Sequence, residues 1–121
     1  MADKIRGVLI NVEDRTVTIK EVDDDFKELQ RIISADFFEI ARRKIGSKIY
    51  AIICDDEGML KDSRISAINR GYSEDILVGN LFICNELGPE LASLLDIDIN
   101  RIIESIRYNA FDSSPILLLE E

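Results

Sequence analysis

Two strongly apolar segments constrain the fold of this chain more than any other feature of its sequence. They cover residues 48–54 and 76–84, and each has the length of one β-strand. The first is too continuously apolar for an exposed edge strand, so we expect it at the centre of a sheet. Gly79 lies inside the second segment, where it predicts a β-bulge or the close approach of another backbone or a ligand.

Alternating β-branched and polar residues predict further strands. Residues 6–12 and 16–22 are separated by turn-forming residues, a pattern that is typical of a β-hairpin. Residues 37–44 are expected to form a strand that a short turn at residues 45–47 joins to the first apolar segment. Another extended piece is expected to begin at Met59.

Helical spacing predicts two helices and one helical turn. Apolar residues recur on one face between Asp25 and Ser34, and Asp25 suits the N-cap position and the helix dipole. A second helix is predicted near Asp98–Tyr108, with Asp98 as its N-cap. A helical turn is expected from Leu87 to Leu94. Residues 61–75 are rich in serine, asparagine, glycine and charge, so we expect a loop that is lightly anchored on the core and favourable for function.

Together these elements predict one α+β domain. Its core is expected to be a mixed, mainly antiparallel sheet of about five strands with two or three short helices. A chain of 121 residues has room for one such core, which we assign to residues 1–108. Residues 109–121 form a C-terminal tail that is expected to be docked or to pair with another chain. A homo-oligomer would then form through the apolar residues Ile116, Leu117, Leu118 and Leu119.

Charge and composition argue against several classes of protein. The net charge is −9, and residues 51–121 carry all of the excess, with 14 acidic and 5 basic side chains. Such a half repels phosphate backbones, so direct binding to nucleic acid is not expected. The chain shows neither a membrane-spanning apolar run nor a secretory signal, which predicts a soluble cytoplasmic protein. Cys54 and Cys84 are expected to be buried thiols.

The residue types available also limit the chemistry. The sequence has no histidine, which removes the commonest general base and the commonest transition-metal ligand. The glycines occur singly, so no phosphate-binding glycine loop is present. The acidic runs at residues 23–25 and 55–57 lack the alternate spacing of a calcium loop, and a helix cap and a solvated turn explain them. We therefore expect a protein that is not an enzyme and that holds no cofactor or metal.

An acidic surface is the first candidate binding site. Acidic residues gather in and beside the expected loop, and an acidic face suits a basic surface on a partner protein. Solubility alone is the simpler explanation of such charge. The candidate residues are Asp55, Asp56, Glu57, Asp62, Glu74 and Asp75.

A basic surface is the alternative candidate. Arg42 and Lys44 share one face of their expected strand, and a charged edge strand that discourages sheet-to-sheet pairing is the ordinary interpretation. In the functional interpretation this face accepts the phosphate of a nucleotide-like ligand. The candidate residues are Arg42, Lys44, Arg64, Asn69 and Arg70, with Lys61 as a further basic residue of the same loop.

Several short segments occur in an order that resembles one protein family. They are Lys20–Asp23, Leu29–Gln30, Cys54–Leu60, Asn69–Arg70, Ile76–Cys84 and Leu91–Leu94. This succession is similar to the family catalogued as domain of unknown function 3846, which is common in bacteriophages and mobile elements of gut and Gram-positive bacteria. The resemblance covers roughly residues 6–105. Compared with the family pattern, residues 63–66 lengthen the connection to Asn69–Arg70, and the proline common in the family is missing. The tail after Tyr108 is also additional to the family pattern.

The resemblance implies a phage or mobile-element setting and a compact α+β fold. It implies no reaction, because the family has no assigned activity. Our first hypothesis is a non-enzymatic accessory protein that uses the acidic surface to bind a host protein and to inhibit or redirect it. The alternative is an oligomeric protein that sequesters a nucleotide-like ligand with the basic residues. Its site is expected at a subunit interface, since a chain of this length has little room for a deep internal pocket.

Overall fold

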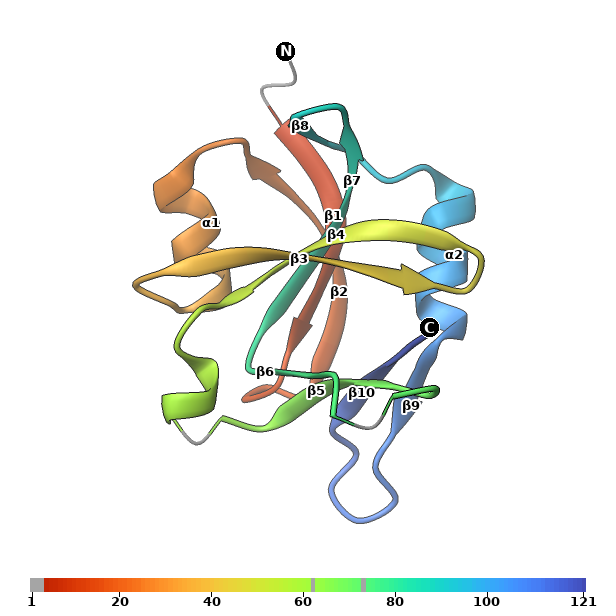
Figure 1. Cartoon of the computed structure of the whole chain (residues 1–121). Coiled ribbons are helices and arrows are strands. Elements are labelled where there is room, and N and C mark those ends of the chain that lie inside the picture. Colours follow the sequence, from red (N-terminus) through yellow and green to blue (C-terminus); the bar gives the residue numbers. More distant parts are fainter. Residues whose placement is uncertain (1–3, 62, 73) are drawn as a thin grey trace.

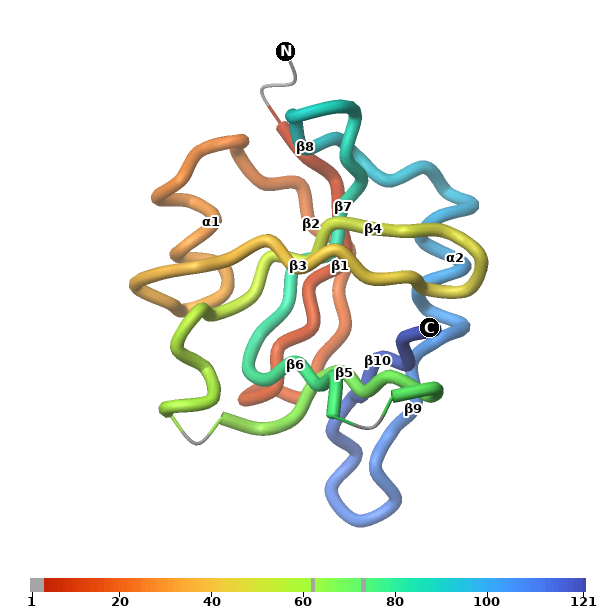
Figure 2. Tube along the Cα trace, in the orientation of Figure 1, coloured from red at the N-terminus to blue at the C-terminus, as the bar shows by residue number. Residues whose placement is uncertain are grey.

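The computed structural model describes residues 4–61, 63–72 and 74–121, which fold into two β-sheets flanked by helices (Figure 1). Figure 2 shows that the chain begins in the larger sheet and ends in the smaller one. The elements are β1 (Lys4–Asn11), β2 (Thr16–Asp23), α1 (Phe26–Ile33), β3 (Phe38–Ile45), β4 (Lys48–Asp55), the 3₁₀ helix η1 (Gly58–Lys61), β5 (Ile65–Asn69), β6 (Ile76–Val78), β7 (Leu81–Leu87), β8 (Glu90–Ala92), α2 (Asp96–Glu104), β9 (Ile106–Tyr108) and β10 (Pro115–Leu119).

The larger sheet has the strand order β2-β1-β7-β4-β3, and β8 pairs with β7 beyond this path. All of its neighbouring strands are antiparallel. β4 has a partner on each side, which confirms that residues 48–54 do not form an edge strand. The opening hairpin and the β3–β4 pair are also confirmed. The α+β class is confirmed, although the described residues contain ten strands in two sheets instead of about five in one.

Both faces of the larger sheet are covered, because successive side chains of a strand point to opposite faces. In β7, Phe82 and Ile83 follow one another and neither has exposed surface. Phe82 belongs to the cluster that includes Leu29 of α1. Ile83 belongs to the cluster that includes Ile102 of α2 and Leu117 of β10. Figure 1 shows α1 and α2 on opposite sides of this sheet.

The smaller sheet has the order β6-β5-β10-β9, with β10 parallel to β5 and antiparallel to β9. Gly79, at φ 78°, separates β6 from β7, so the second apolar segment is shared between the two sheets. A Cβ atom on Gly79 would lie 3.8 Å from the Ser63 side chain, which is an ordinary van der Waals contact. Gly79 therefore lies neither in a β-bulge nor against another backbone, and the positive φ of a turn between sheets explains this glycine. The close approach of a ligand at Gly79 stays a prediction.

Three local predictions are wrong. Residues 61–75 are not simply a loop, because they contain β5, in which Ser66 and Ala67 have no exposed surface. Because Ser66 and Ala67 are small and only weakly apolar, the sequence pattern did not indicate a buried strand here. The helical turn expected at Leu87–Leu94 is instead the β7–β8 hairpin, which Gly88 closes at φ 60°. Met59 lies in a 3₁₀ helix and not in an extended piece.

One helix follows its prediction closely and the other begins and ends earlier. The Asp25 side chain accepts a hydrogen bond from the Glu28 N–H at 3.3 Å, which confirms its N-cap role. The second helix begins at Asp96 after the cap residue Leu95 and ends at Glu104. Asp98 is therefore not the N-cap. It lies within the first turn, where its buried carboxylate accepts the Leu95 N–H at 2.9 Å.

The C-terminal tail completes the smaller sheet. β10 pairs with β5 on one side and β9 on the other, so both of its backbone edges are used within the chain. Leu117 and Leu119 have no exposed surface. A homo-oligomer that pairs through Ile116–Leu119 would therefore have to displace β5 or β9. In the described ranges, no helix has the length and apolar character needed to cross a bilayer.

We expect Leu117→Ala to lower the free energy of unfolding by about 2–5 kcal/mol, because it leaves a cavity between the two sheets. Leu118→Ala is the matched control, since the same atoms are removed from a neighbouring side chain that is only partly buried. We expect it to cost about 1 kcal/mol. Urea unfolding followed by circular dichroism measures both values, and equal losses would contradict the packing of β10.

Candidate functional site

The structure divides the predicted acidic residues into two groups. Asp55, Asp56 and Glu57 lie at the end of β4, whereas Glu74 and Asp75 precede β6. Asp55 lies opposite Phe38 in the β3–β4 pair, whereas Asp75 pairs with Arg43, five residues further along β3. Asp55, Asp56 and Ile76 line one small cavity, so the end of β4 lies beside the start of β6. The predicted Asp62 lies outside the described residues.

Two of these carboxylates are neutralised within the chain. Asp55 accepts from the Lys61 ammonium and from the Glu57 N–H, each at 2.9 Å. Asp75 accepts from Arg43 at 2.9 Å and from Asn69 at 3.2 Å. Burial raises the pKa of Asp75, but the hydrogen bonds from Arg43 and Asn69 outweigh it and leave the pKa lowered. Asp55 and Asp75 therefore act mainly as structural anchors.

Exposed apolar side chains surround the first acidic group. Phe37, Met59 and Leu60 are 59%, 69% and 84% exposed. The Phe37 carbonyl accepts the Asp56 N–H at 3.2 Å, and the Glu57 carbonyl accepts the Leu60 N–H at 3.0 Å, so these residues are local neighbours. We call this surface the acidic–apolar patch, and it consists of Asp36, Phe37, Asp56, Glu57, Met59 and Leu60.

Sequence reasoning found Asp56 and Glu57 but missed Asp36 and the apolar part of this patch. It predicted Phe37 at the start of a strand and Met59 at the start of another extended piece. The available signal was the position of Met59 and Leu60 directly after a polar turn, where no alternating pattern follows. In Figure 1 the end of α1, the beginning of β3 and η1 all lie on the left of the molecule.

The predicted basic residues are also divided. Arg42, Lys44 and Asn69 line one cleft of about 450 Å³ at the β3 edge, together with Ile49 and Tyr72. We call it the β3-edge cleft. Arg64 lines a different cleft, and Arg70 lies 3.9 Å from the Glu120 carboxylate.

Much of the hydrogen-bonding capacity of the β3-edge cleft is used within the chain. Arg42 donates two hydrogen bonds of 2.8 Å to the carboxylate of Glu86. The Asn69 side-chain oxygen accepts the N–H groups of Gly71 and Tyr72, and its nitrogen donates to Asp75 and to the Glu120 carbonyl. Asn69 therefore organises a turn and is poorly placed to bind a ligand. No ion pair among the described residues uses Lys44.

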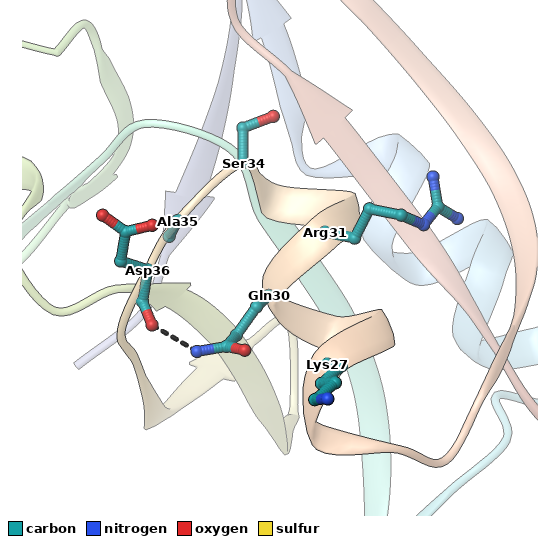
Figure 3. Close-up of a pocket in the computed structure, with 6 residues that line it drawn as sticks. All are labelled: Lys27, Gln30, Arg31, Ser34, Ala35 and Asp36. Carbon is teal, nitrogen blue, oxygen red and sulfur yellow. Dashed lines mark hydrogen bonds between the residues drawn. The ribbon is translucent and has the colours of Figure 1, made fainter.

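A further depression of about 380 Å³ lies on the exposed side of α1. Figure 3 shows that Lys27 and Arg31 point away from one another, while the Gln30 amide turns towards the Asp36 carbonyl oxygen, to which it donates. Arg31 is paired with Glu28. These side chains do not converge on one point, so the depression is not a candidate site.

A buried polar network joins β4, β7 and α2. The Asp98 side chain is 1% exposed and accepts from Lys48 at 3.0 Å and from the Tyr50 hydroxyl at 2.7 Å. It also accepts from Asn85 at 2.9 Å and from Arg101 at 3.3 Å. Asp98 thus ties the first turn of α2 to the larger sheet.

This network and the two cysteines are poorly suited to proton transfer or nucleophilic attack at neutral pH. Burial tends to raise the pKa of Asp98, but hydrogen bonds from the Leu95 N–H and from Tyr50 hold it well below its usual range. Burial and the hydrogen bond to Asp98 raise the pKa of Tyr50 to about 12. Burial also raises the pKa of Cys54 and Cys84 to about 12, and both thiols are free, as expected for core residues.

The strands and helices define a small two-sheet α+β domain. Residues 5–107 match the family described as Domain of unknown function (DUF3846), and the chain belongs to this family. The match confirms the family resemblance and ends before β10. The chain matches no curated protein and no solved structure.

We expect Asp98→Asn to lower the free energy of unfolding at neutral pH by about 3 kcal/mol, because Lys48 and Arg101 lose their buried counter-charge. The pKa of Asp98 is lower in the folded protein than its ordinary value of 3.8, so its ionisation stabilises the fold above pH 3.8 and this contribution is lost as the pH falls further. The difference between wild type and variant should therefore shrink in acid.

Urea unfolding over a series of pH values measures this difference. The matched control is Asp96→Asn, because the Asp96 side chain is 87% exposed and its pairing with Arg6 contributes little. A constant difference between wild type and Asp98→Asn down to strongly acidic pH would contradict the role assigned to the ionised Asp98.

Proposed function

We propose that this chain is a non-enzymatic accessory protein of a bacteriophage or mobile element that binds a host protein and inhibits or redirects it. The binding surface is the acidic–apolar patch, and the partner presents a basic surface with apolar groups at its centre. The setting follows from the family resemblance. The mode of binding follows from the composition and geometry of the patch.

The apolar residues support a protein partner. Protein interfaces are enriched in aromatic residues and methionine at their centre, and a few such side chains account for most of the binding energy. Phe37 and Met59 are residues of these types, and both they and the neighbouring Leu60 are more than half exposed. Their burial against a partner would remove apolar surface from water, which is the main favourable term in association.

The carboxylates of the patch support a basic partner. Among the described residues, no ion pair uses Asp36, Asp56 or Glu57, so these groups are available to Lys and Arg side chains of another protein. The net charge of −9 would also speed the approach of such a partner. The single observation that carries the proposal is the meeting of exposed apolar side chains and unpaired carboxylates at one place.

The frame beneath the patch is pre-organised. Asp55, whose side chain is 7% exposed, holds both the Glu57 N–H and the Lys61 ammonium, and these two contacts fix the beginning and the end of η1. A surface that is already ordered loses less conformational entropy when it binds. The patch is therefore better suited to recognition than an unsupported loop of the same composition.

We expect the double variant Asp56→Lys/Glu57→Lys to weaken capture of the partner at least about tenfold, because it replaces attraction by repulsion. The experiment is affinity capture from a nuclease-treated lysate of a host bacterium at low and high ionic strength, with quantitative mass spectrometry. Leu60→Ser should weaken capture of the same protein without changing its salt dependence.

The matched control is Glu90→Lys/Glu104→Lys, which changes the net charge by the same amount at two exposed positions outside the patch. Circular dichroism melting confirms that every variant is folded. A captured protein with a basic surface that is retained by the control and lost by both patch variants supports the proposal. Equal capture by wild type and patch variants contradicts it.

The β3-edge cleft supports a second proposal, in which an oligomer of the chain sequesters a nucleotide-like ligand. Lys44 would bind the phosphate, and the ring of Tyr72, which is 55% exposed, would stack on the base beside Ile49. Asn69 is not part of this proposal because its hydrogen bonds are used. Arg64 and Arg70 lie outside the cleft lining.

Isothermal titration calorimetry with AMP and ATP tests this second proposal. We expect Lys44→Gln to weaken nucleotide binding about tenfold, whereas Lys20→Gln, an equal change of charge on the exposed strand β2, should have little effect. Analytical ultracentrifugation should show an oligomer that the nucleotide stabilises. A protein that is monomeric at micromolar concentration and binds neither nucleotide would contradict this second proposal.

A further inference from the structure

Two adjoining clefts lie between the β1–β2 turn and residues 61, 63 and 64. Their volumes are about 450 and 210 Å³, and both are lined by Val12, Glu13, Lys61 and Ser63. We call them together the turn cleft. Its lining contains no residue of the acidic–apolar patch and none of the β3-edge cleft.

Three cationic side chains from three segments line the turn cleft: Arg15 from the β1–β2 turn, Lys61 from η1 and Arg64 from the residues before β5. Lys61 gives one hydrogen bond to Asp55, and Arg64 is paired with Asp112 through one terminal nitrogen. No ion pair among the described residues uses Arg15. A guanidinium has five N–H donors and an ammonium three, so most of this donor capacity is available.

The side chain of Asn80 also lines the turn cleft. Its residue is 5% exposed and lines the deeper part, and its side-chain oxygen accepts the Val12 N–H at 2.9 Å. Among the described residues, no hydrogen bond uses its Nδ2 group. The hydroxyl groups of Ser34 and Ser63 lie in the same lining.

Acceptors are scarce in this lining. The two carboxylate oxygens of Asp55 are occupied by Glu57 and Lys61, which leaves the exposed Glu13 as the other carboxylate among the described lining residues. A cleft rich in N–H and O–H donors matches a ligand rich in acceptor oxygens. A phosphate group accepts from several directions at once, whereas a carboxylate lies in one plane, and the donors here come from separate segments.

The donors are held by the framework of strands. The Asn80–Val12 hydrogen bond fixes the β1–β2 turn to the residue before β7, and the Gly79 N–H donates to the Arg64 carbonyl at 2.8 Å. The Lys61–Asp55 ion pair fixes the end of η1 to the end of β4. The backbone around the cleft is thus fixed before a ligand arrives, which lowers the entropy cost of binding.

We propose that the turn cleft binds a small phosphate-bearing ligand, with its oxyanion held by Arg15, Lys61, Arg64 and the side-chain amide of Asn80. The volume of the cleft leaves room for an organic group beyond the phosphate. This site is independent of the acidic–apolar patch, and its failure would leave the protein-binding proposal unchanged.

Titration with inorganic phosphate at constant ionic strength, followed by backbone amide NMR shifts, tests the site. We expect saturable shifts at residues 12–15, 63–64 and 79–80 with a dissociation constant in the millimolar range or below, and chloride should not reproduce them. Asn80→Asp keeps the acceptor for the Val12 N–H and replaces the free donor by a negative oxygen. It should weaken phosphate binding at least about tenfold.

Arg15→Gln is the second variant, because Arg15 is exposed and its removal leaves the fold intact even if Asn80→Asp does not fold. It should weaken phosphate binding about fivefold, whereas the matched control Lys20→Gln should not. Glycerol phosphate should bind at the same amides, and glycerol should not. Shifts that do not saturate, that chloride reproduces, or that Lys20→Gln weakens as much as Arg15→Gln would overturn the proposal.

Discussion

The burial of β4 and β7 on both faces is the constraint on which the rest of the structure depends. Consecutive side chains in these strands point in opposite directions, and Ile52, Ile53, Phe82 and Ile83 have no exposed surface. Each such side chain contributes about 2 kcal/mol when it leaves water, so an uncovered face would forfeit a large part of the stability of a small domain. Helix α1 covers one face, while α2 and the smaller sheet cover the other. The C-terminal strand is therefore a structural part of the domain.

The elements that could be predicted are those whose signal is local. The opening hairpin, α1 and the β3–β4 pair follow from alternation, helical spacing and an aspartate cap within a few residues of one another. The smaller sheet could not be predicted, because Ala67 pairs in parallel with Leu117, far away in the sequence, and β5 is short and built partly of small residues. No local signal shows that the chain changes sheets at Gly79. Asp56 and Glu57 of the acidic–apolar patch were visible in the sequence, but their position beside the exposed Phe37 depends on the register of the β3–β4 pair.

The fold also cancels much of the charge asymmetry seen along the sequence. Basic residues of the first part meet acidic residues of the second: Arg42 pairs with Glu86, Arg43 with Asp75 and Lys48 with Asp98. In the third pair the Asp98 side chain is 1% exposed, and removing its partners would leave an uncompensated buried charge, so this pair favours the observed arrangement of β4 and α2. A smaller set of charged groups lies outside such pairs. Asp56, Glu57 and Arg15 belong to it, and composition alone could not have distinguished them from their paired neighbours.

The short helix η1 separates two surfaces of opposite character, and Asp55 explains how they remain distinct. One carboxylate oxygen of Asp55 accepts the Glu57 N–H beneath the acidic–apolar patch, and the other accepts the Lys61 ammonium at the turn cleft. Without this anchor, the long Lys61 side chain would be free to pair with Asp36 or Glu57, which are close enough to add to the effect of Asp55 in raising the pKa of Lys61. The exposed carboxylates would then be neutralised by their own neighbour. By holding Lys61, a largely buried carboxylate keeps negative charge on one side of η1 and hydrogen-bond donors on the other.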